Sequence, residues 1–205
     1  MSCIRENKKP HVAAVILARG ASKGLLGNNN FDGIAVKPLL LGTLEPAIAC
    51  GKFDSIWVST DDHEIAEVAY FAGPKIKVFD RIDEHTTDEA FSVAAINEFL
   101  AIHKEVDIVG LIQCTSPFIE ASLFVEACNL ITSDQYDSVF AAIRKLKLSV
   151  CSNGKDFVLP CNYLRKDRNT KKNMIGKLVK EGMFYFGKRH IIEAGAMQGG
   201  NNCNI

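Results

Sequence analysis

The 205-residue sequence has no excess of either charge and no hydrophobic run long enough to span a membrane. Twenty-four Lys and Arg balance 24 Asp and Glu, so no overall field would attract nucleic acid or a membrane surface. No run approaches the roughly 18 apolar residues of a membrane span. Residues 1–9 also lack the apolar core of a secretory signal. These absences predict an intracellular protein that binds neither nucleic acid nor membrane.

Two classes of enzyme site are also missing from the sequence. The seven cysteines are odd in number, dispersed and never in Cys-x-x-Cys spacing, which favours free thiols over a disulfide framework or a zinc site. The five histidines show no metal-ligand spacing, and no Gly-x-Ser-x-Gly nucleophile motif occurs. Zinc chemistry and serine-dependent hydrolysis therefore lack their parts.

Apolar strands alternate with amphipathic helices over most of the chain, as in α/β folds. We expect one three-layer α/β/α domain with a mostly parallel sheet at residues 11–200, between a flexible segment 1–10 and a tail 201–205. An irregular insertion is expected at about 145–182. A helix beginning at Pro38 should be kinked or shortened by Pro46. The expected strands are 12–18, 54–59, 75–79, 106–112, 138–143 and 183–186.

The first strand leads into a basic glycine loop, residues 19–24 (RGASKG). Gly20 and Gly24 would let backbone N–H groups approach an anion, while Arg19 and Lys23 supply positive charge. The loop matches neither the Walker pattern nor the Gly-x-Gly-x-x-Gly dinucleotide pattern. A surface turn with two solvated cations is the alternative interpretation of this segment taken alone.

Polar residues follow three of the expected strands, at 19–23, 59–62 and 113–116. In a parallel sheet these carboxyl ends share one edge, so the side chains should face a common crevice. A cationic loop with neutral hydrogen-bonding groups suits a nucleotide better than an apolar cofactor. Asp61 and Asp62 are expected mainly to cap the following helix, with a metal role left open.

Residues 17–24 (LARGASKG) resemble the Leu-Ala-Arg-Gly-Gly-Ser-Lys-Gly signature of CMP-sialic acid synthetases, the N-acylneuraminate cytidylyltransferases. The resemblance implies a nucleotide-diphospho-sugar transferase type of fold. It also implies a reaction in which the anomeric hydroxyl of sialic acid attacks the α-phosphorus of CTP and releases pyrophosphate. Related sugar-acid cytidylyltransferases are a further possibility, which the region around Tyr185 disfavours. Later stretches resemble the animal enzymes in the same order: 57–61, 105–110, 113–117, 136–140 and 184–190.

The resemblance also implies roles for individual residues. Lys171 falls on the catalytic-loop arginine of the family by gap-free counting, and Arg168 would take that place if three residues were inserted. Tyr185 is counted among the substrate-binding residues. The remaining positions resemble ligands of the phosphates (Arg19, Ser22, Lys23 and Asn29), of the cytosine and ribose (Arg81, Ala90 and Ser92), and of the sugar (Gln113).

Besides the lysine at position 171, the sequence departs from the family pattern at two further places. Asn28 stands where the family has a lysine near the phosphates, and Lys37 is the nearest replacement. The family continues past the element matching residues 198–200 to an Asp-x-Asp segment that holds Mg2+, whereas this sequence ends first. Mg2+ is thus expected for the family, with its ligands missing here. A non-catalytic CTP-binding isoform, or a partner subunit of a full-length enzyme, is therefore the alternative function.

Assembly and compartment are further expectations from the resemblance. A homo-oligomer is expected, assembled through the irregular segment after the fifth strand. The basic run 165–172 is a weaker version of the nuclear signal of vertebrate relatives, so nucleus and cytoplasm are the expected compartments. The secretory pathway stays open if the N-terminus is incomplete.

Overall fold

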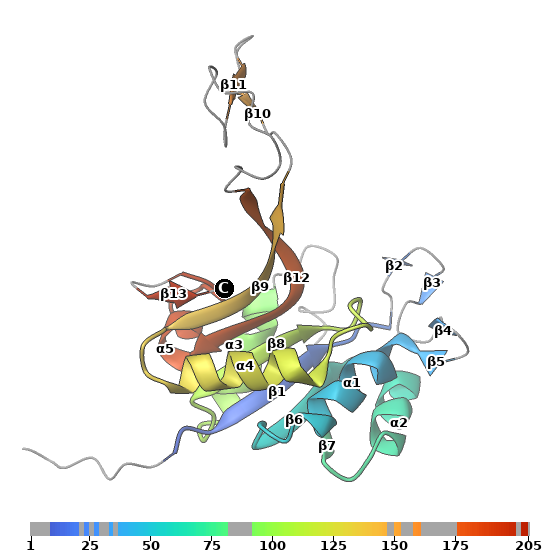
Figure 1. Cartoon of the computed structure of the whole chain (residues 1–205). Coiled ribbons are helices and arrows are strands. Elements are labelled where there is room, and N and C mark those ends of the chain that lie inside the picture. The colour runs from blue at the N-terminus through green and yellow to red at the C-terminus, as the bar shows by residue number, and fades with distance from the viewer. Residues whose placement is uncertain are drawn as a thin grey trace, which may run out of the picture. The chain divides into compact units, whose positions relative to one another are not determined.

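A computed structural model of the chain describes most of the expected domain (Figure 1). It describes residues 9–20, 38–81, 92–146, 176–199 and 202–204, together with the backbone of residues 23–24, 27–28, 33–34, 37, 150–152 and 158–160. The fold divides into two compact units. The first comprises Met1–Phe140 with Gly182–Ile205, and the second comprises Ala141–Glu181.

A mixed sheet forms the centre of the first unit (Figure 1). Among the described residues its strand order is β13-β9-β12-β8-β1-β6-β7. β1 pairs in parallel with both β6 and β8, and β7 continues the parallel part beyond β6. β12 is antiparallel to β8, whereas β13 pairs in parallel with β9. The sheet is therefore mostly parallel, as predicted. The strands are β1 (Val12–Leu17), β6 (Ser55–Thr60), β7 (Ile76–Asp80), β8 (Ile108–Gln113), β9 (Ser138–Lys145), β12 (Lys177–Lys188) and β13 (Cys203–Asn204).

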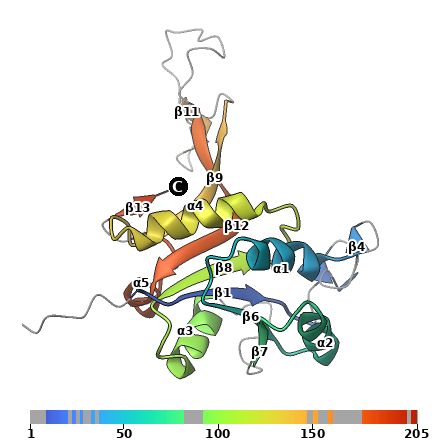
Figure 2. The same cartoon turned by 60° about the horizontal axis from the view of Figure 1, so that its bottom comes forward.

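Helices cover both faces of this sheet, which gives the predicted three layers. Figure 2 shows α1 and α4 along one side of the strands and α3 on the other. α2 packs on the neighbouring strands β6 and β7. The helices are α1 (Leu39–Ala49), α2 (His63–Phe71), α3 (Ser92–Ile102), α4 (Ala121–Thr132) and α5 (Arg189–Glu193).

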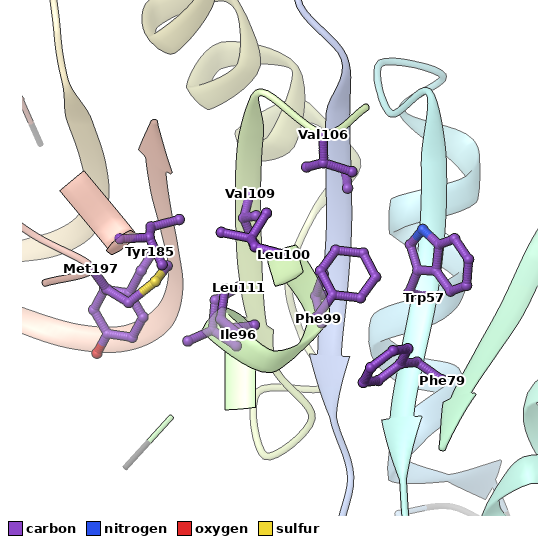
Figure 3. Close-up of a cluster of buried hydrophobic side chains, with 13 residues drawn as sticks. Trp57, Phe79, Ile96, Phe99, Leu100, Val106, Val109, Leu111, Tyr185 and Met197 are labelled. Carbon is purple, nitrogen blue, oxygen red and sulfur yellow. The ribbon is translucent and has the colours of Figure 1, made fainter. Parts of the chain in front are cut away.

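Alternating side chains of the central strands supply the core on each face. Ala13 and Val15 of β1 join a buried cluster with α3, shown in Figure 3, where Trp57 and Phe79 pack around Phe99. On the opposite face, aromatic rings of β12 contact α4, with the Phe124 and Phe184 ring centroids 5.6 Å apart. Because both faces are covered, β1 reads as a continuous apolar run.

Gly110 of β8 makes room for an aromatic ring of the neighbouring strand. It pairs with Phe186 of β12, and a Cβ at position 110 would lie 2.8 Å from Phe186 Cε1. Phe186 is fully buried, so its ring has no open space to enter. Gly110→Ala should therefore lower the free energy of unfolding by about 1 to 3 kcal/mol, measured by urea denaturation. Adding Phe186→Leu should lessen the effect of Gly110→Ala, and an unchanged effect in the double variant would contradict this packing.

The amino ends of the central strands are held by two aspartates. Asp54 accepts hydrogen bonds from the Val12 N–H at 2.9 Å and from Lys9 Nζ at 3.1 Å. Asp107 Oδ2 accepts from the His11 N–H at 2.8 Å. These contacts tie the entry of β1 to both of its neighbouring strands.

The hydrogen bonds to Asp54 should make stability depend on pH. Partial burial alone would raise the pKa of Asp54, but the Val12 N–H and the Lys9 ammonium lower it below the ordinary 3.8. The stabilisation is therefore present above pH 3.8 and is lost as the pH falls through the lower folded-state pKa. Asp54→Asn should cost less than about 1 kcal/mol at pH 7, because the group is largely solvated. Urea denaturation of both proteins from pH 7 to pH 3 should show this difference shrinking, and a growing difference would refute the assignment.

The second unit contains an antiparallel pair, β10 (Val150–Ser152) with β11 (Val158–Pro160). Lys145 Nζ lies 3.5 Å from Glu181 Oε1. Gly176 has a φ of +73°, which favours glycine, and a Cβ there would lie 2.8 Å from Arg144 Cγ. The unit occupies the part of the chain where the sequence predicted an irregular insertion, and it contains these strands.

Apart from shifts of one or two residues at the strand ends, the structure differs from the expectation at three places. α1 is not shortened by Pro46 and runs on to Ala49, because only one backbone donor is lost while Leu44 and Ala47 continue its buried face. β12 begins at Lys177, before the expected start at 183, because the strand lies between β9 and β8 in the sheet and continues into a largely exposed segment that has no buried apolar run. The tail contributes β13, which pairs with Ser138 and Val139 of β9. The expected flexible segment 1–10 lies largely outside the described residues.

Candidate functional site

The carboxyl ends of four parallel strands meet at one edge of the sheet. Leu17 of β1 pairs with Gln113 of β8 on one side and Ser59 of β6 on the other. Ser59 in turn pairs with Phe79 of β7. The chain moves from β1 outward to β6 and β7 and then returns to β8 beside β1, so the loop after β1 lies at a topological switch point. Ligands of open α/β folds bind at such points.

The start of the glycine loop is joined to the loop after β6. The Gly20 N–H donates to Asp61 Oδ1 at 3.1 Å. A Cβ on Gly20 would lie 2.8 Å from Asp62 Cβ, so only glycine allows this close approach. The loop after β1 therefore starts from a fixed position rather than as a loose turn.

Asp62 is the N-cap residue of α2, as the sequence predicted, whereas the capping role expected for Asp61 is wrong, because its carboxylate accepts the Gly20 N–H instead. It has extended backbone, and its Oδ1 accepts from the N–H groups of Glu64 and Ile65 at 2.9 and 3.1 Å. These are the orphan donors that a helix N-cap residue satisfies. His63, the first residue of α2, is exposed, and its Nδ1 lies 3.7 Å from Glu67 Oε1.

Arg81 follows β7 and is buried at the same edge. Its Nη2 donates to the Ser59 carbonyl at 2.6 Å and its Nε to the Ser59 hydroxyl at 3.2 Å. Burial lowers the pKa of Arg81, Asp61 raises it, and the nearby Arg19 lowers it. The net direction is downward, since burial outweighs the favourable carboxylate. At this edge the Arg81 guanidinium thus lies within electrostatic range of the Asp61 carboxylate and of a second guanidinium, that of Arg19.

Cys114 lies beside these arginines, directly after β8. It is buried, and burial raises the pKa of its thiol to about 11, although Arg81 and Arg19 act in the opposite direction. A thiol with such a pKa is protonated at neutral pH and is a poor nucleophile. Cys50, Cys114, Cys128 and Cys203, the cysteines whose side chains the structure describes, form no disulfide.

Comparison with known proteins identifies the family of the chain that forms this site. The profile described as Cytidylyltransferase matches residues 13–175, which include the glycine loop, Asp61 and Arg81. The chain belongs to the cytidylyltransferase family.

Several relatives confirm the resemblance seen in the sequence. The chain is 38% identical to N-acylneuraminate cytidylyltransferase A of Danio rerio over 96% of this chain and 46% of that protein. It is 36% identical to the N-acylneuraminate cytidylyltransferase of Oncorhynchus mykiss over 94% of this chain and 44% of that protein. The chain therefore spans about half the length of the curated relatives it matches.

Solved structures show the same fold at low sequence identity. A CMP:2-keto-3-deoxy-manno-octonic acid synthetase complexed with CTP superposes with a TM-score of 0.65 at 20% identity, over 93% of this chain and 79% of that chain. A 4-diphosphocytidyl-2C-methyl-D-erythritol synthase from Anaerococcus prevotii gives 0.66 at 14% identity, over 90% and 73%. The predicted three-layer cytidylyltransferase fold is confirmed.

Some of the predicted ligand residues lie near the switch point. Arg19 and Arg81 are close enough for their charges to interact, and Gln113 ends β8 half-buried at the same row of the sheet. Ser92 is the exposed first residue of α3. Lys23 is described only by its backbone, which pairs with Asn28.

Tyr185 belongs to the buried cluster of Figure 3, which also includes Met197. Its hydroxyl is 3.4 Å from where a Cβ of Gly182 would lie. Phe184 pairs with Ile112 in the antiparallel register, so Gly182 lies at the level just beyond Gln113. The ring is thus a core residue whose hydroxyl points toward the edge that carries the other candidates.

The other predicted site residues lie outside the described part of the chain. They are Ser22, Asn29, Ala90, Arg168 and Lys171.

The described residues offer neither a metal site nor a membrane span. Among them, no group of three or more His, Cys, Asp or Glu side chains could hold a metal ion. None of the described helices combines the length and the hydropathy that a bilayer span requires.

Sequence reasoning missed two contacts at this edge. Ser59 anchors Arg81 across 22 residues, and Asp61 anchors Gly20 across 41 residues. Serine and aspartate at the end of a strand or just after it are common, so their types alone carry no signal for these pairings. The positions become visible only when the register between β1, β6 and β7 is known.

Proposed function

We propose that the chain binds CTP at the switch point and transfers its cytidylyl group to an N-acylneuraminate. The observation that carries this proposal is the 38% identity to N-acylneuraminate cytidylyltransferase A of Danio rerio over 96% of the chain. The site geometry supports it, since Arg19 and Arg81 concentrate positive charge where a polyphosphate would enter. A neutral overall charge makes such a local cluster necessary.

In the proposed reaction, the anomeric hydroxyl of the sugar attacks the α-phosphorus. An oxygen–phosphorus bond forms and the hydroxyl proton passes to water, while the bond from the α-phosphorus to the oxygen that bridges to the β-phosphate breaks and pyrophosphate leaves with the electron pair. Transfer at phosphorus depends mainly on alignment and on neutralising charge. Arg19 and the glycine loop would hold the phosphates, while Arg81, fixed by Ser59, would orient the nucleoside.

Mg2+ belongs to the proposal as the ion that would neutralise the triphosphate. The described residues contain no donor set that fits it, so we assign it no ligand and no step. We further propose a homo-oligomer located in the nucleus or cytoplasm. Self-association is supported by large apolar side chains exposed within the second unit, namely Ile143, Leu146 and Leu178.

Calorimetry with CTP, ATP and GTP would test the proposed nucleotide specificity. We expect binding of CTP in clear preference to the two purine nucleotides, and equal affinities would refute the cytidine assignment. Release of pyrophosphate from CTP, dependent on added N-acetylneuraminate and Mg2+, would then test the transfer. CTP binding without any such release would favour the non-catalytic role.

A further inference from the structure

Asp61 connects the two loops that face each other at the switch point. Its Oδ1 accepts the Gly20 N–H at 3.1 Å, which links the loop after β1 to the loop after β6. The Asp61 side chain thus contacts the glycine loop at Gly20, the residue directly after the candidate ligand Arg19. The contact therefore sets the direction in which the chain leaves Arg19.

The backbone that carries Asp61 is itself held on both sides. Thr60, before it, ends β6 and accepts the Arg81 N–H through its carbonyl at 3.1 Å. Asp62, after it, is committed to capping α2, and its own N–H donates to the Thr60 hydroxyl at 3.1 Å. Asp61 is thus an acceptor on a rigid base, which is what a positioning group requires.

The negative charge of Asp61 does not explain its presence at this edge. A carboxylate near an incoming triphosphate repels it, and two arginines must offset that repulsion. The hydrogen bond from the Gly20 N–H does not need this charge, because an amide oxygen could accept it equally well. The hydrogen bond and the charge can therefore be separated by substitution.

We propose that Asp61 is a positioning residue of the glycine loop, which it fixes through the Gly20 N–H so that Arg19 points at the bound triphosphate. The identity of the ligand in this inference rests on the proposed function. The contact between Asp61 and Gly20 is observed in the structure and is independent of that function.

The contact is tested first without nucleotide, by amide hydrogen exchange of Gly20 measured by NMR on the full chain. Asp61→Asn keeps an acceptor oxygen and should leave the exchange rate near that of the wild type. Asp61→Ala removes the acceptor and should make Gly20 exchange several-fold faster. Glu64→Ala is the matched control, because it removes a negative charge from the first turn of α2 and should leave Gly20 unchanged.

The effect on the ligand is tested by calorimetry with CTP. Asp61→Asn should bind CTP at least as tightly as the wild type, since it keeps the acceptor and removes a like charge. Asp61→Ala should bind CTP about 2- to 10-fold more weakly than Asp61→Asn, the range of one ordinary hydrogen bond, because both variants remove the charge and only Asn keeps the acceptor. This difference between two variants with the same net charge would not arise from lost charge alone.

Two results would overturn the proposal. One is a Gly20 exchange rate that is the same in Asp61→Ala as in the wild type. The other is an equal loss of CTP affinity in Asp61→Asn and Asp61→Ala, which would make the charge the active feature. If the wild type binds no CTP, the proposed function fails, and the exchange measurement alone then decides the positioning role.

Discussion

Arg189→Ala is expected to lower the free energy of unfolding by about 2 to 4 kcal/mol, because one guanidinium holds three backbone carbonyls. Arg189 Nε donates to the Val106 carbonyl at 2.8 Å, Nη1 to the Leu100 carbonyl at 3.1 Å, and Nη2 to the His103 carbonyl. These carbonyls lie at the end of α3 and in the segment entering β8. A cation there also interacts favourably with the negative end of the helix dipole.

Urea denaturation of wild type, Arg189→Ala and Arg189→Lys would measure this effect. Lysine keeps the charge but lacks the planar fork, so it should recover only part of the stability. Glu193→Ala is the control, since it removes only the partner carboxylate at 3.0 Å on the exposed side. That control should cost less than about 1 kcal/mol. A loss below 0.5 kcal/mol for Arg189→Ala would contradict the proposed clamp, because surface substitutions stay within about that range.

Arg81→Lys is expected to weaken CTP binding about 10-fold or more while leaving inorganic triphosphate nearly unaffected. Lysine retains a positive charge, but it cannot reproduce the two bonds to Ser59 at 2.6 and 3.2 Å that fix the guanidinium plane. A planar group that is held in place contributes through oriented hydrogen bonds, each worth about 1.5 to 3 kcal/mol when one partner is charged. Loss of orientation should therefore affect recognition of the nucleoside more than attraction of the phosphates.

The comparison of CTP with inorganic triphosphate separates two roles for Arg81. Calorimetry of both ligands against both proteins at the same ionic strength gives the four affinities required. Equal weakening of the two ligands would mean that Arg81 acts on the phosphates, and its assignment to the nucleoside would be wrong. Ser59→Ala is a useful companion variant, since it removes one of the two anchors and should weaken CTP by a smaller factor.

Much of the fold could be predicted because local patterns and tertiary structure agree. The apolar run of β1 and the Asp62 cap of α2 each specify their element within a short window. Lys177–Lys188 is different, because most of its first residues are exposed, the apolar Leu178 among them, so no alternation of buried and exposed positions marks where the strand begins. Pro46 likewise misleads, since the buried face of α1 outweighs one missing hydrogen bond.

The candidate site was predictable to a smaller extent. Residues that follow apolar strands could be placed at one edge from the sequence, and Arg19 and Arg81 do come together there. The partners that fix them could not, because Ser59 and Asp61 act through pairings between distant segments. Sequence spacing sets which strands exist, whereas contacts across strand ends depend on their register.

The central position of β1 has a consequence for how the chain is made. Val12 pairs with Ile108, so the second edge of β1 stays unpaired until more than 100 residues have been synthesised. During that interval a six-residue apolar strand offers open backbone donors and acceptors to other nascent chains. Long-range parallel pairing also forms slowly. β1, which is buried on both faces in the folded protein, is therefore open to aggregation during synthesis. The yield of folded protein should accordingly depend on chaperones that bind the nascent chain.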